Sequence, residues 1–268
     1  MNWSWRALPV CIFLAFVGWG AWSVLDSVEE PVVEDWWHPA SGLAWQYQQA
    51  GVVDPVPGVG LYVLDTGLLS APDVAALQAD GAHVVCSFEA GFVTPEVSPQ
   101  VELVPEEAIG DEVEGIGGAR WLDIRDTEGL GPYLTALVDD ALALGCDGIA
   151  PRSVDAWQHA TAYEFRGNEQ LRYIRFIADL THEREMAYGL HNDSEQADRL
   201  AGDVDLFVST GCLAGGGCDL YQPALELDVP VYVVETRANA DRFCAAAAET
   251  GIEFIGKEPD LGHERIAC

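Results

Sequence analysis

The segment LGPYLTALVDDALAL, residues 130–144, followed closely by GIAP, residues 148–151, decides the fold class of this chain. The longer stretch places its apolar side chains on one helical stripe: Leu130, Leu134, Leu137, Val138 and Ala141. Residues 168–185 repeat this helical pattern. The short apolar run at 148–151 predicts a buried strand, so the two stretches together predict a crossover helix that leads into a strand.

Short apolar runs alternate with helical patterns along most of the chain, and this rhythm predicts a parallel sheet. The candidate strands are residues 44–48, 60–65, 82–88, 120–124, 148–151, 187–192, 205–209, 231–235 and 253–256. Eight closed strands fit the length better than a nine-strand open sheet. We therefore expect an α/β protein, a single TIM-type (β/α)8 barrel over residues 36–268, with one extra strand. No G-x-G-x-x-G follows the first strand and no P-loop occurs, which disfavours nucleotide binding.

The N-terminus predicts export. Arg6 precedes an uncharged apolar run that extends from Ala7 to Leu25. Residues 1–25 are therefore expected to be a signal peptide or, since the run is long enough to cross a bilayer, an uncleaved membrane anchor. Residues 26–35 are acidic and lack apolar periodicity, which predicts a linker. The protein is expected to be secreted or extracytoplasmic, with no membrane contact beyond this N-terminal segment.

The chain is strongly acidic, with 44 acids against 13 bases and a formal net charge of −31. Such a charge repels nucleic acid and anionic lipid surfaces and favours a cationic partner. Solubility at high salt is the simpler explanation of the acidity, because screening removes the self-repulsion. No oligomeric state follows from the composition.

Cysteines beyond the N-terminal run number six: Cys86, Cys146, Cys212, Cys218, Cys244 and Cys268. An even number in an exported chain suggests disulfides. Proximity in sequence favours Cys212 with Cys218 and Cys244 with Cys268, which leaves Cys86 with Cys146. A zinc site is the rival explanation, but no C-x-x-C or H-x-x-x-H spacing occurs. We expect neither a metal nor a cofactor.

Acidic residues recur at or just after the ends of six candidate strands, where (β/α) barrels carry their functional groups. A single acid there is usually a solvated loop residue or a helix cap, but six predict an acidic cleft. Glycoside hydrolysis needs two carboxyl groups, which such a cleft can supply. The six acids are Asp65, Glu89, Asp123, Asp155, Asp193 and Glu235.

An ordered set of short motifs resembles the endo-α-1,4-polygalactosaminidase family, glycoside hydrolase family 114. The motifs are WQYQ at 45–48, WLDIR at 121–125, GCDGI at 145–149, HND at 191–193 with Gln196, the pair Cys212 and Cys218, and Val234-Glu235. The resemblance covers residues 36–268. It implies a TIM barrel that cleaves α-1,4-linked galactosamine polymers, whose deacetylated units are cationic.

The chain departs from the family at the acids themselves. Where the family typically has Glu-Pro-Asp-Asn-Val-Asp, this chain has APRSVD at 150–155, which leaves Ala150 and Arg152 in place of two acids. Thr210 stands where the family has a glutamate, and its hydroxyl cannot donate a proton as a carboxyl does. Arg152 would oppose a cationic sugar unless it pairs with Asp155 or a neighbouring acid.

Two hypotheses about function follow. In the first, a divergent glycoside hydrolase uses Asp155 with Glu235 or Asp193 as its acid and base. In the second, a non-catalytic barrel binds an extracellular or envelope polysaccharide or oligosaccharide; a structural envelope protein without a sugar ligand is a third alternative. The residues expected to contact substrate are Trp45, Gln46, Asp65, Asp123, Arg152, His191 and Asn192.

Overall fold

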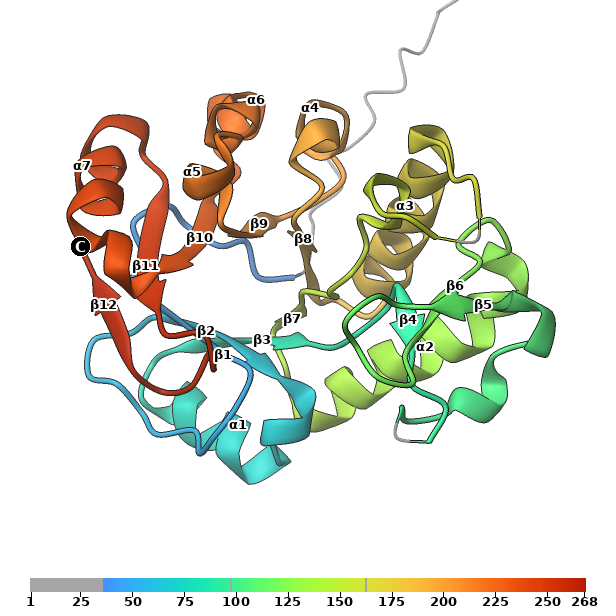
Figure 1. Cartoon of the computed structure of the whole chain (residues 1–268). Helices are drawn as coiled ribbons and strands as arrows, with labels where there is room; N and C mark the ends of the chain where they lie inside the picture. Colours follow the sequence, from blue (N-terminus) through green and yellow to red (C-terminus); the bar gives the residue numbers. More distant parts are fainter. Residues whose placement is uncertain (1–35, 97, 162) are drawn as a thin grey trace, which may run out of the picture. The chain divides into compact units, whose positions relative to one another are not determined.

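Eight parallel strands form the centre of the computed structural model, which describes residues 36–96, 98–161 and 163–268 (Figure 1). In sheet order they are β1 (Trp45–Gln48), β2 (Leu61–Asp65), β3 (His83–Ser87), β7 (Gly148–Ile149), β8 (Ala187–His191), β9 (Leu206–Thr210), β10 (Val231–Thr236) and β11 (Glu253–Lys257). A ninth strand, β12 (Arg265–Ala267), pairs antiparallel with β11. The sheet curls into a nearly closed barrel, and the predicted (β/α)8 barrel with an extra strand is confirmed.

Side chains join the two edges of the barrel between β1 and β11. The Trp45 indole donates to the carbonyl of Glu253 at 3.2 Å. The Gln46 amide donates to the carbonyl of His263 at 2.7 Å and accepts from the Lys257 ammonium at 3.1 Å. These bonds stabilise the seam where the ladder of backbone bonds is interrupted.

The predicted strand at 120–124 does not belong to the barrel, which corrects the expectation. This stretch forms β6 (Arg120–Leu122), which lies between β4 (Phe92–Val93) and β5 (Ile109–Glu112) in a small antiparallel sheet. The small sheet is an insertion between β3 and β7, and it lies to the right of the barrel in Figure 1. An apolar run gives no indication of which sheet a strand joins.

Helices cover the outside of the barrel. They are α1 (Ala71–Ala79), α2 (Thr127–Leu144), α3 (Gly167–His182), α4 (Ala197–Leu200), α5 (Cys212–Gly215), α6 (Gln222–Glu226) and α7 (Ala240–Thr250). α2 begins after Asp126, whose carboxylate accepts from the backbone N–H of Gly129, and ends at Gly145 with φ of 87°. The two helices expected from the apolar stripes, at 130–144 and 168–185, are confirmed as α2 and α3. No helix in the described ranges is long and apolar enough to cross a membrane.

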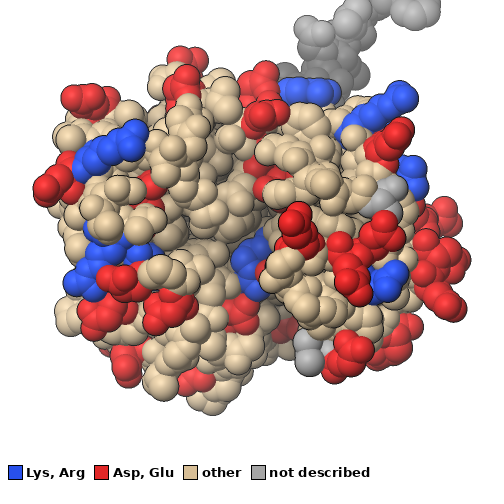
Figure 2. Space-filling view, in the orientation of Figure 1, with Lys and Arg blue, Asp and Glu red and all other residues tan. Residues whose placement is uncertain are grey.

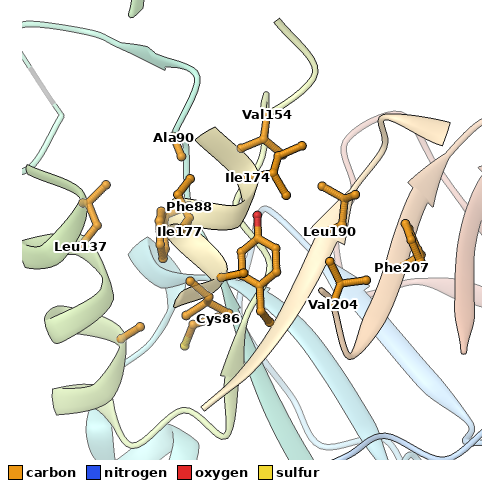
Figure 3. Close-up of a cluster of buried hydrophobic side chains, with 14 of the residues drawn as sticks. Cys86, Phe88, Ala90, Leu137, Val154, Ile174, Ile177, Leu190, Val204 and Phe207 are labelled. Carbon is orange, nitrogen blue, oxygen red and sulfur yellow. The ribbon is translucent and has the colours of Figure 1, made fainter. Parts of the chain in front are cut away.

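Alternation along the strands separates two cores. One set of side chains fills the barrel interior: Trp45, Tyr47, Leu61, Val63, Val85, Ala150, Leu206, Val208, Tyr232, Val234 and Ile255. The opposite set packs between the strands and the helices. Figure 3 shows part of it, in which Leu190 of β8 lies near Ile174 of α3, and Phe207 of β9 and Ile177 of α3 belong to the same cluster. Residues that continue the interior register past the strand ends therefore point into the mouth of the barrel.

Three disulfides connect Cys86 to Cys146, Cys212 to Cys218 and Cys244 to Cys268. These are the pairings expected from the sequence. Disulfides persist in oxidising compartments, which supports an extracytoplasmic location. The signal or anchor expected at residues 1–25 and the linker expected at 26–35 lie outside the described residues.

A single buried carboxylate, Asp205, ties the start of the described chain to the barrel. Its Oδ1 accepts from the Trp36 indole at 2.9 Å and lies 3.1 Å from Nδ1 of His38. Its Oδ2 lies 2.9 Å from Nε2 of His182 and accepts from the backbone N–H of Tyr188 at 2.8 Å. Burial alone would raise the pKa of Asp205, but the bonds from His182, Trp36 and Tyr188 bring this pKa below its ordinary value.

Replacing Asp205 with asparagine is predicted to destabilise the protein by about 3 kcal/mol at pH 7, because buried donors lose a charged acceptor. The folded-state pKa of Asp205 is lowered, so its stabilising contribution is present above the unfolded pKa and is lost as pH falls through the folded pKa. Urea unfolding of D205N and wild type across pH 3 to 7 should show the difference shrinking in acid. D203N, which removes the exposed partner of Arg175, is the control and should cost about 1 kcal/mol or less.

Candidate functional site

Arg152 occupies the mouth of the barrel at the end of β7. Its Nη2 donates to Oδ2 of Asp65 at 2.7 Å, and its Nε donates to Oε1 of Glu89 at 2.7 Å. Nη1 donates to the Ser87 hydroxyl at 3.1 Å and also bonds the side-chain carbonyl of Gln49. The guanidinium therefore uses all three nitrogens to join residues at the ends of β1, β2 and β3.

The other carboxylate oxygens of this cluster also have protein partners. Oδ1 of Asp65 accepts from the backbone N–H of Gly67 at 2.8 Å, and Oε2 of Glu89 accepts from the Ser153 hydroxyl at 2.7 Å. All four carboxylate oxygens are thus engaged within the protein. Arg152 pairs with Asp65 and Glu89, and not with Asp155, the partner first considered from the sequence.

Electrostatics keep this guanidinium charged. Its side chain is 16% exposed. Burial alone would lower the pKa of Arg152, but the charges of Glu89 and Asp65 raise this pKa above its ordinary value. Two carboxylates surround one guanidinium, so the cluster as a whole does not repel a cationic sugar as the isolated Arg152 charge would.

Beside the cluster, Tyr47 and His191 lie in contact inside the barrel. The Tyr47 hydroxyl and Nε2 of His191 are 3.2 Å apart. Burial, and then the charge of Arg152, lower the pKa of His191 to about 3. His191 is therefore neutral at physiological pH and supplies no charge to a ligand.

A pocket of about 440 Å³ opens next to this cluster, at the ends of β8 and β9. We call it the mouth pocket. It includes no lysine or arginine among its lining residues, which are Asp155, Gln158, Asn192, Asp193, Ser194, Glu195, Ser209, Thr210, Cys212, Gly215, Gly216, Gly217, Leu220 and Tyr221. Its polar groups are carboxylates, amides and hydroxyls, which are the groups that bind sugar hydroxyls and amines.

Asp193 has one engaged and one unengaged oxygen in this pocket wall. Its Oδ1 accepts from the Trp157 indole at 2.7 Å and from the Gln158 amide at 2.9 Å. Its Oδ2 is buried and has no hydrogen-bond partner among the described residues, and the residue is only 1% exposed. Burial raises the pKa of Asp193 to about 7; the bonds from Trp157 and Gln158 oppose this rise, and the charges of Asp155 and Glu195 add to it.

Two residues of the mouth pocket have left-handed backbones. Asn192 and Asp193 have φ values of 59° and 51°. Left-handed conformations are unfavourable for side chains with a Cβ and persist where the surroundings enforce them, often at functional sites. The side chain of Asn192 helps to hold the left-handed backbone of this residue, because its Oδ1 accepts from the backbone N–H of Thr210 at 3.0 Å.

The structure places two of the three predicted catalytic acids together. Asp155 and Asp193 both line the mouth pocket, and Oδ1 of Asp155 lies 3.2 Å from Nε2 of His159. Glu235 is not among the residues that line the mouth pocket. Its Oε1 accepts from the backbone N–H of Leu213 at 2.7 Å, so it anchors the start of α5.

Predicted substrate contacts divide in the same way. Asn192 lines the mouth pocket. Asp65, Arg152 and His191 lie at the ends of barrel strands and point inward, toward the mouth of the barrel. Trp45 and Gln46 lie at the seam of the barrel, where their polar atoms are bonded to the chain. Asp123 follows β6 and makes a two-point pair with Arg125 at 2.7 Å, away from the barrel strands.

The sequence prediction missed several groups that complete the site. Ser87 and Gln49 bind Arg152, and Gln158 binds Asp193. Trp157 was expected from the sequence as an aromatic surface for a sugar, but its bond to Asp193 was not. Ser87 could have been found, since it lies two residues beyond the interior residue Val85 on the same strand. The contacts of Trp157 and Gln158 depend on a loop geometry that has no sequence signature.

A parallel (β/α)8 barrel with carboxylates and amides at its carboxyl end has the architecture of many carbohydrate-active enzymes. The family model of glycoside-hydrolase family GH114 matches residues 28–268. The chain belongs to this family, as its motifs predict. No protein of curated function matches the sequence.

Solved structures share this fold. Ega3 of Aspergillus fumigatus, in complex with galactosamine, has a TM-score of 0.80 at 22% identity, and the match covers 87% of this chain and 97% of that chain. The glycoside hydrolase domain of PelA from Pseudomonas aeruginosa has a TM-score of 0.63 at 12% identity, with 84% and 98% covered. At these identities the likeness establishes the fold.

Replacing Arg152 with methionine is predicted to destabilise the protein by about 3 kcal/mol at pH 7, because it leaves two carboxylates without their cation. The loss of unfolding free energy should be smaller at pH 4.5 than at pH 7, because the unpaired carboxylates of Asp65 and Glu89 take up protons on acidification. Urea unfolding at pH 7 and pH 4.5 measures both effects. R175M, which removes an exposed ion pair with Asp203, is the control and should cost about 1 kcal/mol or less at either pH. An R152M variant as stable as R175M would contradict the proposed ion cluster.

Proposed function

We propose that this protein binds a polysaccharide or oligosaccharide outside the cytoplasm through the mouth pocket, without cleaving it by the family's two-carboxyl route. Membership of GH114 supports a carbohydrate ligand, as does the galactosamine complex of Ega3. The absence of lysine and arginine from the pocket lining suits a neutral or cationic sugar better than an anionic one.

The observation that carries this proposal is the Arg152 cluster. Glycoside hydrolysis needs one carboxyl group that protonates the leaving oxygen and a second that acts as nucleophile or base. Both groups must reach the sugar. Arg152 lies between the carboxylates of Asp65 and Glu89, and every oxygen of the two has a protein partner.

Thr210 removes the second component of the family mechanism. Its backbone N–H and its hydroxyl both lie within hydrogen-bonding distance of the side-chain oxygen Oδ1 of Asn192, at 3.0 and 3.3 Å. A hydroxyl in this position can orient a sugar but cannot act as an acid at neutral pH. The substitutions at Arg152 and Thr210 thus leave a polar pocket suited to binding.

The proposal predicts that α-1,4-linked galactosamine oligomers bind to the wild-type protein and are not cleaved. Calorimetry should show binding that weakens about tenfold in D193N, because the wall of the mouth pocket loses a carboxylate that attracts a cationic sugar. D198N, which changes an exposed acid of α4, is the matched control and should bind as wild type does. Steady release of reducing ends by wild type, abolished in D155N, would contradict the binding-only function.

Hydrolysis by acids other than those of the family mechanism is a second candidate. The raised pKa of Asp193 and its place in the mouth pocket favour this candidate. A pKa of about 7 leaves Asp193 partly protonated at neutral pH, as a general acid must be. Asp155 is the acid in the same pocket that would serve as its partner. Glu235 is the weaker choice, because its Oε1 accepts from the backbone N–H of Leu213 in α5 and the residue does not line the mouth pocket.

This candidate predicts a distinct pH dependence. A general acid works in its protonated form, so cleavage should fall as pH rises through about 7, and D193N should abolish it. Reducing-end assays from pH 5 to 9 measure this profile. Cleavage that persists in D193N, or that increases above pH 7, would exclude Asp193 as the acid.

The N-terminal segment completes the proposed arrangement. Residues 1–25 would export the chain or, if uncleaved, tether it to the membrane, and residues 26–35 would connect this segment to the barrel. The three disulfides support an extracytoplasmic location.

A further inference from the structure

A second pocket lies over the small sheet inserted between β3 and β7. Its volume is about 390 Å³, and we call it the sheet pocket. Phe92 comes from β4 and Trp121 from β6, whereas Ser153 and His159 come from the segment after β7. The lining residues are Phe92, Val113, Glu114, Ile116, Trp121, Ser153, His159 and Ala160.

One pair of contacting side chains connects the two pockets. Asp155 lines the mouth pocket and His159 lines the sheet pocket, and the two side chains are 3.2 Å apart. The His159 side chain is 48% exposed, and its ring stacks on Trp121 with centroids 5.5 Å apart and planes 23° from parallel. A ligand that leaves the mouth pocket over Asp155 therefore meets the outer face of His159 next.

The sheet pocket is fixed to the mouth of the barrel. The backbone N–H of Ala90 donates to the carbonyl of Arg152 at 3.1 Å, and the Ser153 hydroxyl donates to Glu89. A Cβ at Gly91 would lie 1.7 Å from the carbonyl oxygen of Ser153, so only glycine permits this approach. The two pockets consequently keep one spacing.

The chemistry of the sheet pocket suits a sugar ring. Buried Phe92 and Trp121 form its floor, and Ile116, 45% exposed, and the His159 ring form its exposed walls. Aromatic and apolar surfaces of this kind pack against the C–H face of a pyranose. Glu114 is the acid that lines it. Figure 2 shows acidic side chains gathered over this part of the molecule, which disfavours an anionic polymer.

We infer that the sheet pocket is a second sugar subsite, and that the protein binds a continuous run of neutral or cationic sugar units across the Asp155 and His159 pair. This inference rests on the proposed function, since the mouth pocket must bind the first unit. It adds that recognition depends on chain length.

Calorimetry with α-1,4-linked galactosamine oligomers of one to six units tests the inference. Wild-type affinity should rise about tenfold or more between the shortest and longest oligomers. I116K removes an apolar wall and places a positive charge at an exposed position of the sheet pocket, where it repels the cationic units, so it should remove this rise while leaving the affinity for the monomer unchanged. L142K changes an equally exposed leucine, 45%, on α2 and should retain the full rise.

Three results would overturn the inference. Affinity that does not change with oligomer length would exclude a second subsite, and the mouth pocket alone would account for binding. A rise that I116K leaves intact would place further subsites elsewhere on the barrel, with the proposed function unaffected. Failure of every oligomer to bind would overturn the proposed function and this subsite together.

Discussion

The ion cluster of Arg152 with Asp65 and Glu89 determines what the mouth of this barrel can do. Carboxylates at this depth are costly to bury unless they are paired, and the guanidinium supplies two bonds at 2.7 Å that satisfy both. The same bonds occupy one oxygen of each acid, and Gly67 and Ser153 occupy the others. Under the proposed function, Arg152 therefore stabilises the strand ends and leaves no free pair of carboxylates between Asp65 and Glu89.

The proposed function assigns ligand recognition to the flank of the barrel formed by the ends of β8 and β9. Asn192 and Asp193 adopt left-handed backbones there, and Asp193 has a buried oxygen without a partner among the described residues. Left-handed backbones and unsatisfied polar atoms both cost stability, so their coincidence in one pocket supports the proposal. The neighbouring sheet pocket adds apolar walls to this polar site, and together they suit a polymer better than a single sugar.

Sequence patterns predicted the barrel, its disulfides and its family because each has a local signature. Apolar runs defined the eight barrel strands, and spacing along the chain selected the cysteine pairs. The barrel strand predicted at residues 120–124 was wrong, because Trp121 and Leu122 are as apolar as the residues of a barrel strand, although they belong to the small sheet. Because of that error the Arg152 cluster could not be predicted. With another strand between β3 and β7, Glu89 and Arg152 would not be neighbours. The bonds by which Trp45 and Gln46 close the seam were not predicted either, since no sequence pattern shows where their polar atoms bind.

A crystal structure of the protein with an α-1,4-linked galactosamine tetramer tests the central claim most directly. The sugar should lie in the mouth pocket against Asp155 and Asp193, with Arg152 still bonded to Asp65 and Glu89. A tetramer whose glycosidic oxygen lies between Asp65 and Glu89, with Arg152 displaced from both, would contradict it.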